Sequence, residues 1–184
     1  EFGRVAINVS GTELRESDTI TGRHLGDRVL WLPAPPGQGE EGSIEQVQPR
    51  RNLLYRQDEI RTKSFAANID QVLILIAAEP VFSESQLARA LIAAHEAGIP
   101  PIVALNKSDL TGPFAQAWER LAPYRAITDA DGQPHYRVLG LNLAAPDARQ
   151  DQLLQELLAD KVTLVLGPSG SGKSTLINHL IPQA

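Results

Sequence analysis

The chain has 184 residues with 42% hydrophobic and 21% charged residues, a balance typical of a soluble folded protein and not of a disordered one. No cysteine is present, so we expect no disulfides and no thiolate metal sites in these residues. No long apolar run is present either, so we expect no signal peptide and no membrane segment in them, and a cytoplasmic location. The net charge of -5 excludes a protein that holds nucleic acid by overall charge alone.

The first 63 residues are predicted to form an all-β domain. Apolar alternations at residues 26–32 and 42–47 are separated by turn-forming residues, most clearly the Pro- and Gly-rich stretch 33–39. Short strands over this length would close into a small barrel, and OB-like (oligonucleotide-binding) barrels are one such architecture. The strands alone leave open whether the domain binds nucleic acid or serves as a structural or docking domain.

Residues 64–184 are predicted to form an α/β domain, a parallel sheet with flanking helices, because strands alternate with helices from about residue 67. A helix capped by Ser83 ends near Gly98, another spans 113–121, and Asp147 caps a third that is rich in leucine. A final helix runs from about residue 172 to 181. The expected strands are 71–76, 102–105, 136–141 and 162–166.

A glycine-rich segment follows the last of these strands and matches the P-loop pattern in full: Gly167-Pro168-Ser169-Gly170-Ser171-Gly172-Lys173-Ser174. Glycines let backbone amides converge on phosphates, and the start of the following helix adds its dipole. Lys173 is expected to reach the β- and γ-phosphates, Ser174 to ligate Mg²⁺, and Thr175 to touch the α-phosphate. The alternative is a glycine-rich turn that merely caps a helix.

The tetrapeptide Asn106-Lys107-Ser108-Asp109 follows the strand 102–105 and indicates which base is bound. A carboxylate at Asp109 can accept two hydrogen bonds from the N1–H and exocyclic amine of guanine, a donor pair that adenine lacks. Lys107 would lie along the purine face, and Asn106 would tie this loop to the phosphate loop. The alternative is an ordinary polar turn between a strand and a helix.

Three classes of function remain at this point. The leading interpretation is an enzyme that binds GTP or GDP with Mg²⁺ and hydrolyses GTP. The second is a P-loop ATPase or kinase in which the tetrapeptide at 106–109 is accidental. The third is a nucleotide-binding RNA-docking or scaffold module without hydrolysis.

The base-reading tetrapeptide precedes the P-loop in this chain, the reverse of the order in Ras-like GTPases. This order resembles the circularly permuted GTPases, and the β domain in front of it resembles the bacterial RsgA (YjeQ) family of small-subunit-dependent GTPases. Further likeness lies in Val47-Gln48-Pro49-Arg50 and in Ala67-Asn68-Ile69-Asp70-Gln71.

The resemblance implies an OB-like barrel that contacts 16S rRNA, and GTP hydrolysis stimulated by the small ribosomal subunit (30S) during its late maturation. We also expect a monomer. A strip of basic residues is compatible with RNA contact: Arg50, Arg51, Arg56, Arg61 and Lys63. The family's zinc-binding C-terminal domain, its Asp-x-x-Gly switch motif and the catalytic group are expected outside these residues.

Two local expectations concern the family's remaining motifs. Asp129-Ala130-Asp131-Gly132 has the letters of the switch motif but precedes the P-loop, so we expect an ordinary loop there. Residues 141–143 stand where the family has its base-supporting loop. The family's sheet has more strands than the four predicted here, so we expect the edge of strand 162–166 to be unpaired. We also expect the chain to bind nucleotide weakly and to hydrolyse it poorly.

Overall fold

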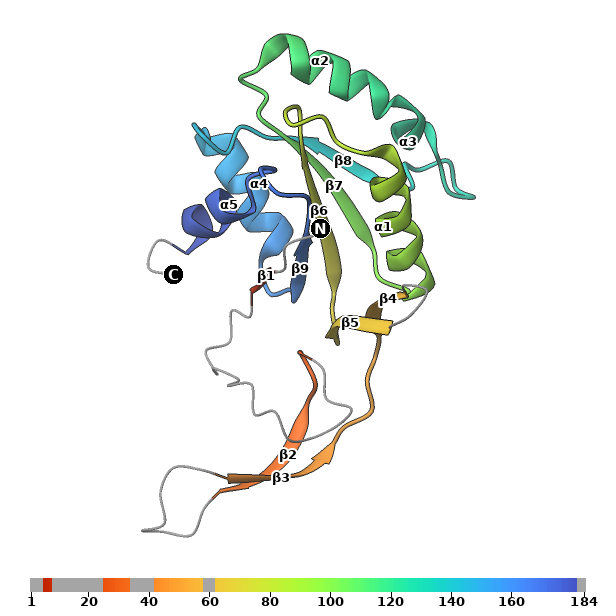
Figure 1. The fold of residues 1–184 in the computed structure, drawn as a ribbon, viewed down its shortest axis with the longest axis vertical. Helices are drawn as coiled ribbons and strands as arrows, with labels where there is room; N and C mark the ends of the chain where they lie inside the picture. The colour runs from red at the N-terminus through yellow and green to blue at the C-terminus, as the bar shows by residue number, and fades with distance from the viewer. Residues whose placement is uncertain (1–4, 8–24, 34–41, 58–61, 182–184) are drawn as a thin grey trace.

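The computed structural model describes residues 5–7, 25–33, 42–57 and 62–181. Its main body is a five-stranded sheet with helices on both faces (Figure 1), in the order β1-β9-β6-β7-β8. The last four strands of this order are parallel to one another, whereas β1 runs antiparallel to β9. The strands are β1 (Val5–Ile7), β6 (Gln71–Ala77), β7 (Pro101–Asn106), β8 (Arg137–Gly140) and β9 (Thr163–Leu166).

The centre of the sheet confirms the strand predictions. Every residue of β6 is buried, as the continuous apolar run predicted, because helices cover both faces of a parallel sheet. Successive side chains of β6 enter opposite cores: Ile74 and Ile76 one, Leu73 and Leu75 the other. The sheet therefore separates two apolar layers.

One face of the sheet is covered by α1 (Glu84–Glu96), α2 (Thr111–Arg120) and α3 (Ala122–Ala126), and the other by α4 (Ala148–Leu158) and α5 (Lys173–Leu180) (Figure 1). The predicted caps are present: Ser83 accepts a hydrogen bond from the Gln86 amide at 3.4 Å, and Asp147 accepts one from the Gln150 amide at 2.8 Å. Helix α3, which follows α2 directly, was not predicted.

The four strands between β1 and β6 form two separate antiparallel pairs. The strands β2 (Val29–Pro33) and β3 (Gly42–Val47) make one, and β4 (Leu53–Gln57) and β5 (Thr62–Ala67) make the other. The predicted OB-like barrel is not confirmed, since within the described residues these strands do not close on themselves. Most of the turn stretch 33–39 lies outside the described residues.

The edge of β9 was predicted to be unpaired, and this was wrong. Strand β1 pairs antiparallel along it, with Val5 opposite Val165. The physical reason is that an open strand edge offers backbone donors and acceptors to any short extended segment, whatever its side chains. Sequence patterning does not indicate such a partner.

Residues 129–132 form a loop, as expected from their place in the chain. The Asp129 carboxylate accepts hydrogen bonds from the amides of Asp131 at 3.0 Å and Gln133 at 2.9 Å, which closes the turn locally. Among the residues that the structure describes, no helix is long and apolar enough to cross a membrane, and no group of three or more His, Cys, Asp or Glu side chains could hold a metal ion.

Candidate nucleotide-binding site

The two loops singled out in the sequence meet at the carboxyl end of the parallel sheet. The phosphate loop (residues 167–174) follows β9, and the base loop (residues 106–109) follows β7, with β6 between them in the sheet. The Asn106 side chain bridges the two, because its amide nitrogen donates to the carbonyl of Ser171 at 3.0 Å. The carboxyl ends of parallel strands are where sheets of this kind bind ligands.

The phosphate loop leaves no room for side chains at its glycines. A Cβ atom on Gly167 would lie 2.1 Å from the Leu75 carbonyl oxygen, and one on Gly172 would lie 2.3 Å from the Asn106 amide nitrogen. Gly170 and Gly172 also have φ of +77° and +104°, a region that L side chains rarely adopt. Glycine is therefore needed at Gly167 and Gly172 for the loop to pack against β6 and the base loop, and at Gly170 for its backbone conformation.

Lys173 opens helix α5 and folds back over the phosphate loop. Its ammonium donates to the carbonyls of Gly167 at 2.9 Å and Pro168 at 2.7 Å. Burial of this ammonium lowers the pKa of Lys173 from its usual 10.5. Ser174 and Thr175, which follow in the first turn, are exposed. A cation held over a ring of backbone groups at a helix start is suited to an anionic ligand.

The base loop combines a buried amide with an exposed carboxylate. Asn106 is only 4% exposed, and its carbonyl oxygen accepts a hydrogen bond from the Leu143 amide at 3.0 Å. Lys107 has φ of +70°, an uncommon conformation for a residue with a side chain and one that recurs at functional sites. Asp109 is exposed, so its carboxylate is open to a ligand.

The loop after β8 joins the same site and has contacts that the sequence did not indicate. The Ser108 amide donates to the Leu141 carbonyl at 3.0 Å, which places residues 141–143 beside the base loop, where the family resemblance put its base-supporting loop. Gln150 on α4 holds the next residue at both backbone groups: it accepts from the Asn142 amide at 2.6 Å and donates to the Asn142 carbonyl at 3.2 Å. No local sequence signal marks Gln150.

The opposite end of the sheet carries a paired polar network. The Asp70 carboxylate accepts from the Val162 amide and from the Arg51 guanidinium, both at 2.7 Å. Both contacts lower the pKa of Asp70, the Val162 amide having the larger effect. Gln71, 4% exposed, donates to the Leu157 carbonyl at 2.8 Å and the Thr163 hydroxyl at 2.9 Å. These groups join the start of β6 to the start of β9 and to α4.

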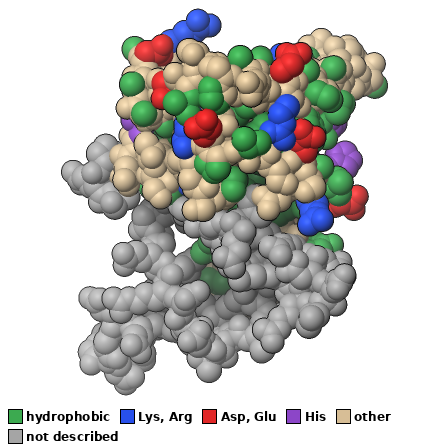
Figure 2. All heavy atoms as spheres, turned by 45° about the horizontal axis from the view of Figure 1, so that its top comes forward, with side chains coloured by type: hydrophobic (Ala, Val, Ile, Leu, Met, Phe, Trp, Pro, Cys, Tyr) green, Lys and Arg blue, Asp and Glu red, His purple; other side chains and the backbone are tan. Residues whose placement is uncertain are grey.

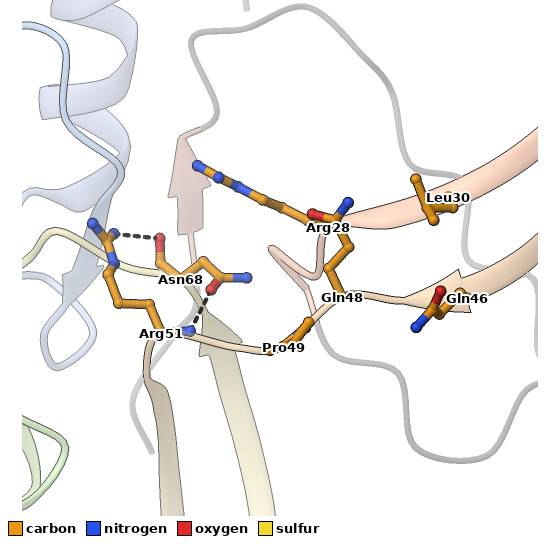
Figure 3. Close-up of a pocket in the computed structure, with 7 residues that line it drawn as sticks. All are labelled: Arg28, Leu30, Gln46, Gln48, Pro49, Arg51 and Asn68. Atoms are coloured by element: carbon orange, nitrogen blue, oxygen red, sulfur yellow. Dashed lines mark hydrogen bonds between the residues drawn. The ribbon is translucent and has the colours of Figure 1, made fainter.

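A cavity of about 400 Å³ lies at the base of the β2–β3 pair (Figure 3). Arg28, Arg51 and Asn68 lie on its wall, with no acidic residue among the lining set, which is completed by Leu30, Gln46, Gln48 and Pro49. Arg51 is engaged with Asn68 and Asp70. On the face in Figure 2, by contrast, acidic and basic side chains are interspersed among apolar ones. Of the predicted basic strip, the side chains of Arg56, Arg61 and Lys63 lie outside the described residues.

The parallel sheet, its flanking helices and the P-loop between β9 and α5 define an α/β fold of the kind found in P-loop GTPases. A family model described as RsgA GTPase matches residues 47–184. The chain belongs to this family, which confirms the resemblance drawn from the order of the two motifs.

Three relatives illustrate the likeness. A protein of Variovorax paradoxus is 62% identical over 160 residues, covering 87% of this chain and 47% of that protein. One of Burkholderia mallei is 48% identical over 161 residues, covering 87% and 48%. Both are named small ribosomal subunit biogenesis GTPase RsgA. The crystal structure of YjeQ from Thermotoga maritima matches with a TM-score of 0.65 and 25% identity, covering 89% of this chain and 53% of that one. The chain thus spans about half the length of the relatives it matches.

Proposed function

We propose that the chain binds GDP and GTP across the phosphate loop and the base loop, and that it forms the nucleotide-binding part of a GTP hydrolase. The observation that carries the proposal is the buried Asn106 amide, which contacts both the Ser171 carbonyl of one loop and the Leu143 amide beside the other. A single side chain thereby sets the spacing between a phosphate-binding and a base-binding element. The GTPase names of the relatives support the same function.

In this proposal each loop has its own chemistry. Backbone amides from Gly167 to Ser174, the α5 dipole and the Lys173 ammonium hold the phosphates. The Lys173 ammonium would leave the Gly167 and Pro168 carbonyls for phosphate oxygens, which offset the cost of its burial. The Asp109 carboxylate accepts two hydrogen bonds from guanine, and the base then covers a group that is exposed without it.

Magnesium fits the same loop in one respect. Ser174 presents a hydroxyl, a hard oxygen donor of the kind that Mg²⁺ prefers, in the helix turn next to Lys173. When bound there, Mg²⁺ would neutralise charge on the β- and γ-phosphates during hydrolysis. The chain's own contribution is to orient the phosphates and keep them in place. We assign no residue of this chain to activation of the attacking water.

Nucleotide competition tests the guanine assignment against a P-loop ATPase or kinase. A fluorescent GDP analogue bound to the chain should be displaced by GDP at concentrations at least about a hundredfold lower than those needed for ADP, because adenine lacks the donor pair that Asp109 accepts. Equal displacement by ADP and GDP would remove the guanine assignment. Binding of neither nucleotide, together with intact docking to ribosomes, would favour the scaffold alternative.

We further propose that the family context extends to this chain: a circularly permuted GTPase that acts with the small ribosomal subunit in its late maturation. In this proposal residues 1–63 form a separate OB-like domain and residues 64–184 the GTPase domain, although β5 crosses that boundary. The names of the relatives support the ribosomal role. A monomeric, cytoplasmic protein is part of the same proposal.

The cavity of Figure 3 is our candidate for contact with 16S rRNA, since guanidinium and amide groups without carboxylates suit a phosphate backbone. Arg28→Ala should weaken binding to purified small subunits and make that binding less dependent on salt, by about one phosphate contact. Arg89→Ala, a loss of the same charge from an exposed position on α1, is the control. Equal effects of the two variants would remove the cavity from the interface.

A further inference from the structure

The loop that follows β8 is held by hydrogen bonds on three sides. Its Leu141 carbonyl accepts from the Ser108 amide at 3.0 Å, and its Leu143 amide donates to the Asn106 side chain at 3.0 Å. Between them, Asn142 is held at both backbone groups by Gln150. Two of these anchors come from the base loop itself, so the third, from α4, is the only one of the three that belongs to a different element.

Gln150 takes the place of a missing strand neighbour. Strand β8 is the last strand of the sheet in the described residues and ends at Gly140, so the backbone of Asn142 has no ladder partner beyond it. A glutamine side chain carries a carbonyl acceptor and an NH2 donor group side by side, and here they satisfy the Asn142 amide at 2.6 Å and the Asn142 carbonyl at 3.2 Å. Alanine cannot replace either contact.

Helix α4, which carries Gln150, is held in place by packing and by a polar contact. Helix α4 buries Leu154 and Leu157 against the sheet, with exposed fractions of 0% and 2%. Its Asp151 carboxylate contacts the ring nitrogen Nε2 of His179 on α5 at 2.7 Å, which fixes the first turn of α4 to the helix that starts in the phosphate loop. Gln150 therefore projects from an element with a fixed position.

The outer side of the loop faces open space. A cavity of about 680 Å³ lies there, lined in part by Ser108, Gly140, Asn142 and Gln150. Leu141 and Leu143 pack into the core on the inner side of the loop, with exposed fractions of 1% and 3%. Asn142 between them lines the cavity instead, so the position of its backbone depends on the hydrogen bonds to Gln150. Asn142 closes the loop internally, because its side chain accepts from the Ala145 amide at 3.2 Å.

From these contacts we infer that Gln150 is a positioning residue for base recognition: it fixes the loop of residues 141–145 against the base loop and so sets the affinity for the guanine base but not for the phosphates. The inference rests on the proposed guanine-nucleotide function. Gln150 contacts the backbone of the loop and acts on the base only through it.

The test compares two ligands and three variants of the full chain. Gln150→Ala removes both contacts, and Gln150→Glu keeps the acceptor for the Asn142 amide but sets a second oxygen against the Asn142 carbonyl. Gln152→Ala is the matched control, because Gln152 is exposed two residues away on the same helix and bonds only within it, to Glu156 at 2.8 Å. Affinities for GDP and for inorganic pyrophosphate are measured by calorimetry.

Gln150→Ala loses both hydrogen bonds that order the loop, and Gln150→Glu loses one and adds repulsion between two oxygens. Both variants should therefore weaken GDP binding about tenfold and leave pyrophosphate binding within about twofold of the wild type. The Gln152→Ala control should bind both ligands as the wild type does. A purely structural role would weaken both ligands together, and that outcome overturns the inference. So does GDP binding within about twofold of the wild type in both Gln150 variants.

Two further outcomes keep this inference distinct from the proposed function. Should Gln150→Ala fail to fold, judged by circular dichroism, Gln150→Glu decides the matter alone, since it retains one of the two contacts. A wild-type chain that shows no preference for GDP over ADP removes the proposed function and the role of Gln150 with it. A wild-type chain that prefers GDP, with unchanged Gln150 variants, removes only the role of Gln150.

Discussion

The amino and carboxyl ends of the parallel sheet use their polar groups in opposite ways. At the amino end, Asp70 and Gln71 are paired with backbone and side-chain groups of neighbouring elements. At the carboxyl end, Lys173 is held partly buried over carbonyl groups, Asp109 is exposed, and the Ser171 hydroxyl is buried with no partner among the described residues. One end contributes stability, and the other keeps groups ready for a ligand.

This contrast has a physical basis. A polar group that is paired within the chain stabilises the fold but has little left to offer a ligand, whereas an unpaired or strained group costs stability until a ligand satisfies it. Variants at the two ends should therefore change different properties. Those at the carboxyl end should alter nucleotide affinity, and those at the amino end should alter the free energy of unfolding.

The largest expected effect is at Lys173. Lys173→Ala removes the cation from the phosphate loop and should weaken GDP binding by about a hundredfold, because charged hydrogen bonds contribute about 1.5–3 kcal/mol each. Lys161→Ala is the matched control at the other end of β9, where the ammonium contacts Gln71 at 3.4 Å. Titration calorimetry with GDP measures both, and a similar loss of affinity in the two variants would contradict the contrast between the ends.

Asp109→Ala should weaken GDP binding at least about tenfold, since the two hydrogen bonds to guanine are lost. The free energy of unfolding without nucleotide should stay within about 0.5 kcal/mol of the wild type, because the carboxylate is exposed. Equilibrium binding and urea unfolding give the two numbers. A change in affinity below about twofold would refute the role of Asp109.

Asp70→Ala should show the reverse pattern: a loss of about 1 kcal/mol in the free energy of unfolding and unchanged GDP affinity. The folded-state pKa of Asp70 lies below the unfolded value of 3.8, so its contribution is present above pH 3.8 and disappears as the pH falls through the lowered pKa. Urea unfolding of both proteins from pH 7 downward should show the two stabilities converging at acid pH. A constant difference would mean that the Asp70 carboxylate is not its source.

The smallest effect concerns Ser171. Its hydroxyl is buried without a partner among the described residues, whereas its backbone carbonyl accepts the Asn106 amide. Ser171→Ala should therefore raise the free energy of unfolding without nucleotide by about 0.5 kcal/mol and weaken GDP binding only slightly, by about twofold. Thermal unfolding with and without GDP checks both parts. A destabilised variant would show that the hydroxyl has a partner in solution.

The loops at the carboxyl end of the sheet could be predicted from the sequence, because they depend on local chemistry. The P-loop glycines, Lys173 and the tetrapeptide after β7 have fixed spacings because ligand geometry demands them, and the buried runs on either side identify their strands. Ser83 and Asp147 could likewise be predicted as helix caps, since capping depends on residues within one turn. The family followed from the order of the two motifs.

The amino-acid sequence by itself thus determined the strands of the parallel sheet, the helix caps and the two loops, because each depends on neighbours within a few positions. Only the tertiary structure decided that Gln150 holds Asn142 and that Asp70 contacts Val162 across 92 positions. It also decided that β1 lies on the edge of β9 and that β2 to β5 form two pairs. The reason is that polar side chains and strand edges accept many partners. Which partner they find depends on where the whole chain brings them.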